Sequence, residues 1–159
     1  MTFRENGAVG ALLDEYERAI RDLKTTIEPI SEHQLKTIAD TETADEDCRS
    51  IQNVLTHVVR SGYGYVVYIR KHQGENIPFV KGQLLDSAAE YAAALDAMFQ
   101  YNVKLFQDYP NLQLEELDNS KKLITRWGQC FDPEQLIEHA IVHILRHRRQ
   151  IERFLLKMT

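Results

Sequence analysis

The stretch from Asp132 to Met158 constrains this chain most, because it joins an amphipathic helical pattern to three evenly spaced histidines. Pro133, near its start, is typical of the first turn of a helix, where the missing N–H is not needed. The histidines follow four residues apart and therefore lie one above another on one helical face; they are His139, His143 and His147. Two such imidazoles can hold one metal ion when another helix supplies further ligands.

Three earlier segments carry apolar residues at intervals of three and four, which is typical of helices that pack by one face. Serine caps and helix-ending prolines or glycines mark several of their boundaries. The predicted helices run from about Asn6 to Glu28, from Ser50 to about Gly74, from Ser87 to Tyr109 and from Asp132 to Met158. The run from Ser31 to Gln34 predicts a short capped turn. The sequence therefore predicts an all-α four-helix bundle that forms a single domain over residues 1–159.

The lengths of the connections predict how the helices are ordered. Roughly twenty residues join the first helix to the second and the third to the fourth, and fewer join the second to the third. Short links favour antiparallel neighbours, and long links can cross the length of a bundle. We therefore expect an up-up-down-down bundle with long crossovers between helices one and two and between helices three and four. Cys48 and Cys130 then precede helices that start at opposite ends, so we expect no disulfide between them.

Composition and charge exclude several classes of protein. The net charge of −5 argues against nucleic acid as a partner, because phosphate binding usually needs a basic surface. No apolar run approaches membrane-spanning length, and the first six residues contain no long apolar region, so we expect neither a membrane span nor a signal peptide. Two cysteines do not make a secreted disulfide framework, so the expected location is the cytoplasm.

The histidines of the last predicted helix do not all face the same way. At about 100° per residue, His147 falls about 20° from the centre of the apolar stripe, His143 about 60° and His139 about 100°. His147 and His143 thus point inward, whereas His139 sits at the edge. One inward histidine is usually a hydrogen-bonded core residue. Two of them, each needing polar partners in a dry core, favour a metal site.

A third candidate ligand lies in the second predicted helix. His57 stands on the same row as Ser61 and Gly64, whose small side chains leave room for a ligand or a substrate. Taken alone, His57 is better explained as a packed core or boundary histidine, but beside the inward pair it completes a three-histidine set. Tyr63, Tyr65 and Tyr68 follow it and could line a pocket or donate hydrogen bonds, although packing within the bundle explains them more simply.

Two runs resemble motifs of the DinB-like (YfiT-like) superfamily. Residues Ser50–Val58 resemble its second-helix motif, and residues Leu136–Ile151 resemble its C-terminal motif, in which a histidine is followed four residues later by His-Arg-Gly-Gln. The resemblance implies a four-helix bundle that holds a divalent metal, commonly zinc or nickel. Carried over by position, the ligands are His57, His143 and His147, in agreement with the facing argument.

The sequence departs from this pattern at Arg149, where the superfamily usually has glycine, and its helical angle points away from the apolar stripe. His139 has no fixed role in the superfamily. It remains open as an alternative ligand, a partner of a ligand or a surface histidine, of which the last is the simplest.

The resemblance also limits the expected function to a few classes of activity. Relatives resemble thiol transferases that use low-molecular-weight thiols, an isomerase, or metal-dependent hydrolases. By this analogy we expect a metal-dependent enzyme with an open coordination position that acts on a small molecule, by thiol S-transfer or hydrolysis, and a homodimer. The competing readings are a non-catalytic metal-binding bundle with a sensing or interaction role, and a plain bundle with buried histidines.

Basic residues follow the last histidine pair and allow two explanations. They could bind an anionic substrate or partner, or they could simply form a solvated helix end that offsets the helix dipole, which is the simpler explanation; they are Arg146, Arg148, Arg149 and Arg153.

Overall fold

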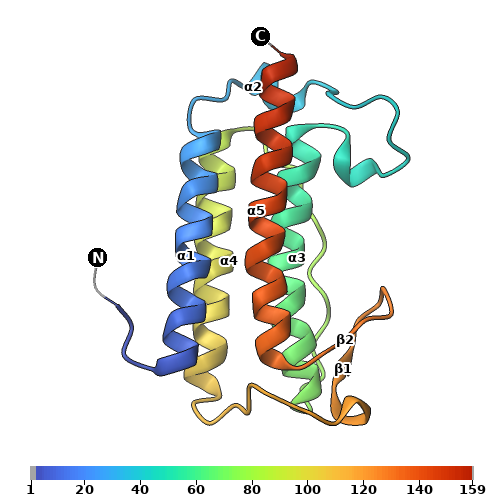
Figure 1. Ribbon diagram of the computed structural model, residues 1–159. Helices are drawn as coiled ribbons and strands as arrows, with labels where there is room; N and C mark the ends of the chain where they lie inside the picture. Colours follow the sequence, from blue (N-terminus) through green and yellow to red (C-terminus); the bar gives the residue numbers. More distant parts are fainter. Residues whose placement is uncertain (1–2, 159) are drawn as a thin grey trace.

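The computed structural model describes residues 3–158 and shows four long helices that stand side by side (Figure 1). They are α1 (Gly7–Ile27), α3 (Ile51–His72), α4 (Ala88–Asp108) and α5 (Pro133–Lys157). Short elements occupy the connections: α2 (Glu32–Lys36), η1 (Glu46–Cys48), η2 (Asn119–Lys121), and β1 (Leu123–Ile124), which pairs antiparallel with β2 (Cys130–Phe131). The predicted all-α class is confirmed. No helix among residues 3–158 has both the length and the apolar character needed to cross a bilayer.

The helices begin where the sequence carries cap residues. The side chains of Ser50, Ser87 and Asp132 each accept a hydrogen bond from the backbone N–H three residues later, at the starts of α3, α4 and α5. Such a bond satisfies one of the free N–H groups of a helix start. Ser31 caps α2 in the same way, as the sequence predicted. Local hydrogen bonds thus set these boundaries.

Side-chain contacts show that α3 and α4 run in the same direction. Near their starts, the hydroxyls of Thr56 and Tyr91 lie 2.5 Å apart. Near their ends, the guanidinium of Arg70 donates to the carboxylate of Asp108 over 2.6 Å. Because Arg70 is buried, this ion pair ties the two helix ends together in a partly desolvated setting.

The other helix pairs fix the remaining directions. The ring of His57 lies 5.0 Å from that of His147, and the ring of Tyr65, two turns further along α3, lies 5.5 Å from that of His139. The helices α3 and α5 are therefore antiparallel. In Figure 1, α1 and α5 rise from one end of the bundle while α3 and α4 descend from the other. α1 packs against α4 and α5, and α3 packs against the same two helices.

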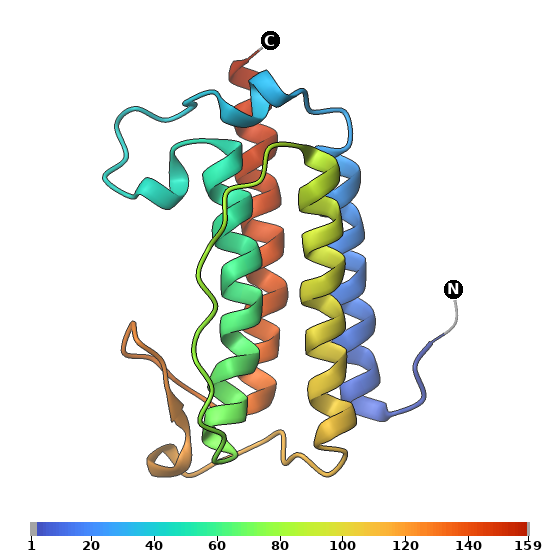
Figure 2. The same cartoon turned by 180° about the vertical axis from the view of Figure 1, so that it is seen from behind.

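The bundle is therefore up-down-down-up, and the predicted up-up-down-down order is wrong. The crossover that spans the bundle is segment 73–87, between α3 and α4, which Figure 2 shows running back along α3. Extended at about 3.3 Å per residue, it reaches about 50 Å, more than the roughly 32 Å length of a 21-residue helix.

The two connections predicted to cross the bundle do not do so. They remain at one end each, because they fold locally: the first contains α2 and η1, and the second contains η2 and the β1–β2 hairpin. Their length is taken up by this local structure. Cys48 and Cys130 are both free and lie in these two connections.

Gly62 lets α3 and α4 approach closely at the centre of the bundle. A Cβ atom placed on Gly62 would lie 2.8 Å from Cγ of the buried Met98. The sulfur of Met98 accepts a hydrogen bond from the Tyr16 hydroxyl over 3.5 Å, and its carbonyl accepts one from the Asn102 amide over 2.9 Å. A Cβ atom placed on Gly64, by contrast, would come no closer than 4.0 Å to a neighbouring side chain, that of Phe79.

We predict opposite effects for the same change at these two glycines. Gly62→Ala should lower the free energy of unfolding by about 1–3 kcal/mol, because the added methyl group overpacks the core against Met98. Gly64→Ala should leave stability unchanged or raise it by up to about 1 kcal/mol, since alanine favours helix more than glycine does. Urea denaturation of both variants measures the difference. Equal stability of the two would contradict the close approach at Gly62.

Candidate metal centre

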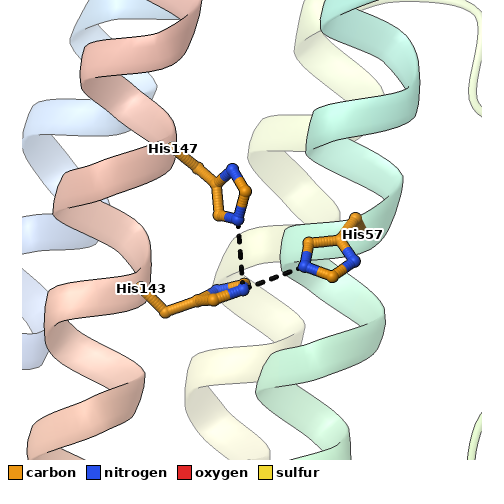
Figure 3. A group of neighbouring side chains, drawn as sticks. All are labelled: His57, His143 and His147. Carbon is orange, nitrogen blue, oxygen red and sulfur yellow. Dashed lines mark hydrogen bonds between the residues drawn. The ribbon is translucent and has the colours of Figure 1, made fainter. Parts of the chain in front are cut away.

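Three histidines from two helices converge between α3 and α5 (Figure 3). The Nε2 atom of His143 lies 2.9 Å from Nε2 of His57 and 3.1 Å from Nε2 of His147. One nitrogen from each ring lies within 4.8 Å of the others. His143 and His147 are buried one turn apart on α5, and the antiparallel packing of α3 brings His57, 86 residues away from His143, to the same point.

Hydrogen bonds on the far side of two rings orient them. Nδ1 of His57 lies 3.0 Å from a carboxylate oxygen of Asp47, which also accepts a bond from Arg60 over 2.6 Å. Nδ1 of His147 lies 2.9 Å from the side-chain oxygen of Gln150. Because the Gln150 oxygen is an acceptor, Nδ1 of His147 carries the proton and its Nε2 presents its lone pair to the shared space. Nδ1 of His57 lies between an acceptor, Asp47, and a donor, Arg60, at 3.2 Å; when it donates to the carboxylate, Nε2 of His57 presents its lone pair in the same way.

The set of nitrogens fits a metal ion better than it fits hydrogen bonding alone. The lone pairs of His57 and His147 both point toward Nε2 of His143, which can donate at most one hydrogen. Among the three rings, at least one acceptor thus lacks a donor. A cation at the centre would satisfy every lone pair. Imidazole nitrogens are ordinary zinc ligands, and three of them within 4.8 Å of one another supply a compact donor set for one ion.

The rings are held in the neutral state that a metal requires. Burial, followed by the proximity of the other histidines, lowers the pKa of His143 to about 2. Burial lowers the pKa of His147 to about 4, against the opposing effect of Gln150. Burial also lowers the pKa of His57, although the carboxylate of Asp47 partly offsets it. Neutral imidazole is the ligand form, so the site needs no deprotonation to bind a metal at pH 7.

The cluster forms part of the wall of a cavity with a volume of about 940 Å³. His57 and His143 line the cavity, whereas His147 is not among its lining residues. Four of the residues that the sequence offered for a pocket also line it; they are Ser61, Gly64, Tyr65 and Tyr68. Tyr63 is not among the lining residues, and its ring lies 5.3 Å from that of Tyr101. Other lining residues come from outside the helices, from Phe79 to Gly82 in the crossover and from the turn between β1 and β2.

His139 lies in the cavity wall and not in the three-histidine group. It is partly buried, and its ring stacks on that of Trp127 with centroids 5.8 Å apart. Its ring centroid is 6.2 Å from that of His143. The structure thus places it as a lining residue one turn before the first buried histidine of α5.

Several residues that shape this site escaped the sequence analysis. Asp47 lies in an acidic segment without apolar periodicity, and nothing in the sequence separates it from its acidic neighbours as a partner of His57. Gln150 belongs to the C-terminal motif, but its contact with His147 was not predicted. Hydrogen-bond acceptors near the candidate histidine ligands are a signal for residues of this kind, because metal-binding histidines usually donate their second N–H.

We predict that the metal-free protein loses stability as the pH falls from about 7 to about 4. The folded-state pKa values of His143 and His147, about 2 and about 4, lie below the ordinary value of 6.5, so the unfolded chain binds more protons in this range. The free energy of unfolding therefore decreases on acidification, by at most about 1.4 kcal/mol per pH unit for each histidine.

Urea denaturation in the presence of a chelator measures this dependence. His147→Gln should reduce the slope of stability against pH, because it removes one of the histidines whose pKa is lowered in the folded state. His72→Gln changes an exposed histidine and should keep the wild-type slope. An unchanged slope in His147→Gln would contradict the prediction.

The sequence also matches a known protein family. The family model of the DinB superfamily matches residues 15–151, a range that contains all three clustered histidines and most of the four long helices. No curated protein matches the sequence closely enough to serve as a relative. On the extent of the family match, the chain belongs to the DinB superfamily.

Proposed function

We propose that this protein is a metal-dependent enzyme that acts on a small molecule. The observation that carries the proposal is the convergence of three neutral imidazoles, with their free nitrogens together, at the wall of a cavity. His57, His143 and His147 would hold the metal. Membership of the DinB superfamily is compatible with this role.

The position of the cluster supports a catalytic site over a structural one. Within residues 3–158, the group consists of three histidines, and four protein ligands are typical of closed structural sites. His57 and His143 border the cavity, so a metal held by the group would face it. A small molecule in the cavity would then have access to the metal.

The reaction classes we propose are thiol S-transfer and hydrolysis. A divalent ion such as zinc or nickel would lower the pKa of a thiol or a water molecule in the cavity and so supply a nucleophile near neutral pH. The partner expected for transfer is a low-molecular-weight thiol, and for hydrolysis a small ester or amide.

The chain's own residues hold and enclose the site. Asp47 and Gln150 fix the orientation of two of the rings through their Nδ1 atoms. The hydroxyl of Tyr68 accepts a hydrogen bond from the backbone N–H of Arg126 over 2.9 Å, which ties the β1–β2 turn to α3. This bond keeps Trp127 in the cavity wall, where its ring lies 5.8 Å from that of Tyr68. These aromatic side chains give part of the cavity wall an apolar surface.

We predict that the protein, purified without an affinity tag and incubated with zinc or nickel, retains about one ion per chain after desalting. His143→Ala should abolish this binding, because it removes the nitrogen that lies nearest to both others. Elemental analysis measures the content. His72→Ala, which changes an exposed histidine, is the control and should bind metal as the wild type does. Stoichiometric metal in His143→Ala would overturn the assignment of the ligands.

We further predict metal-dependent turnover. With cysteine and chlorodinitrobenzene as a test of thiol transfer, and a nitrophenyl ester as a test of hydrolysis, absorbance should show catalysis of at least one reaction by the metal-loaded protein. Metal-stripped protein and His57→Ala should lose at least about 100-fold in rate, and re-addition of metal should restore only the wild type. A protein that binds metal but catalyses neither reaction, nor others of these two classes, would favour a sensing or interaction role.

A further inference from the structure

The cavity has a charge opposite to that of the whole protein. The chain carries a net charge of −5. Among the described residues, however, the lining of the cavity contains four cationic side chains and no carboxylate; the cations are Arg60, Lys81, Arg126 and Arg146. Arg60 is partly buried and the other three are exposed to solvent, and together they give this concave surface a positive potential.

Three of the four cations lack an ion-pair partner. Arg60 donates to Asp47 over 2.6 Å, so its charge is partly compensated. The guanidinium of Arg126 lies over the ring of Phe79, 4.0 Å from the centroid, which positions the charge without neutralising it. No salt bridge within residues 3–158 involves Arg126, Lys81 or Arg146. The cavity therefore holds cationic charge that the protein itself does not balance.

Two of the arginines flank the histidine cluster from opposite helices. Arg60 follows His57 by three residues on α3, and Arg146 follows His143 by three residues on α5. Residues three apart lie on the same face of a helix, and both arginines line the cavity with their histidines. Guanidinium groups bind carboxylate and phosphate oxygens in pairs, a geometry that lysine lacks.

Much of the remaining wall is aromatic. The rings of Tyr68 and Phe79 lie 4.8 Å apart, and Trp127 stacks on His139 with centroids 5.8 Å apart. These side chains border the same cavity as the arginines. A volume of about 940 Å³ falls in the usual range for small-molecule sites and is too small for a folded macromolecule. The cavity therefore combines anion recognition with apolar surfaces suited to a planar body.

We propose that the cavity binds an organic anion, a carboxylate or a phosphate ester on a planar apolar body. Arg146, assisted by Arg60, holds the anionic group beside the three histidines, and the body lies against Trp127 and Phe79. This proposal rests on the proposed function in one respect, since a metal held by the histidines would mark where the substrate reacts. It adds the chemical class of that substrate. The recognition itself depends on the arginines and aromatic rings, not on the metal.

Trp127 provides a direct measure of binding, because it is the single tryptophan of the chain and lies in the cavity wall. Its fluorescence is titrated with benzoate, with phenyl phosphate and with benzamide, the neutral counterpart of benzoate, at constant ionic strength. The titrations are made on zinc-loaded and on metal-stripped protein. We expect saturable quenching by at least one anion in both forms, with benzamide binding at least about tenfold more weakly than benzoate.

A matched pair of variants separates the cavity from overall charge. Arg146→Gln should weaken binding of the anions at least about tenfold and leave benzamide unaffected. Arg149→Gln removes the same charge from an exposed arginine of α5 that does not line the cavity, and should change the affinity less than about twofold. Equal effects of the two variants, or equal binding of benzoate and benzamide, would overturn the proposal.

The metal-stripped protein distinguishes this proposal from the proposed function. Quenching that appears only with zinc and is insensitive to Arg146→Gln would place the anion on the metal and overturn the role of the arginines. Absence of quenching by either anion in both forms would also overturn it. Failure of the protein to bind metal, or to catalyse a reaction, would instead contradict the proposed function. The titration of the metal-free protein would still test whether the cavity binds an anion.

Discussion

The antiparallel packing of α3 against α5 is the constraint on which the site depends. It brings Nε2 of His57 to 2.9 Å from Nε2 of His143, although the two residues lie 86 positions apart. Once the rings are together and buried, desolvation keeps them neutral, and the acceptors on their far sides turn the lone pairs inward. A compact set of nitrogen ligands follows from helix packing and from two hydrogen bonds.

The connections build what the four helices do not supply. Asp47 reaches His57 from η1, within the connection between α1 and α3. Phe79 enters the cavity wall from the crossover, and Trp127 enters it from the turn between β1 and β2. The helices thus hold the histidines in place, and the irregular segments shape the space beside them. Loops positioned by a rigid scaffold are common in functional sites.

The cavity lining and the whole protein differ in the sign of their charge. The protein is acidic as a whole, yet the cavity is lined by arginine and lysine with no carboxylate among its described residues. Arg146 belongs to the basic cluster of α5, for which a solvated helix end was the simpler explanation. Its neighbour Arg148 pairs with Asp22 of α1 and with Glu152 of α5, and so contributes to the contact between these two helices. Arg146 faces the cavity, so the cluster serves two different environments.

The sequence by itself determined what depends on neighbours along the chain. Helix boundaries followed from caps such as Ser50 and Ser87, and the inward positions of His143 and His147 followed from helical periodicity. These features rest on hydrogen bonds and spacings within a few residues. Tertiary structure alone decided the up-down-down-up order, because a connection can use its length in local folds such as α2 instead of crossing the bundle. It likewise decided that Asp47 meets His57 and that Trp127 stacks on His139, since these contacts arise only when packing brings distant segments together.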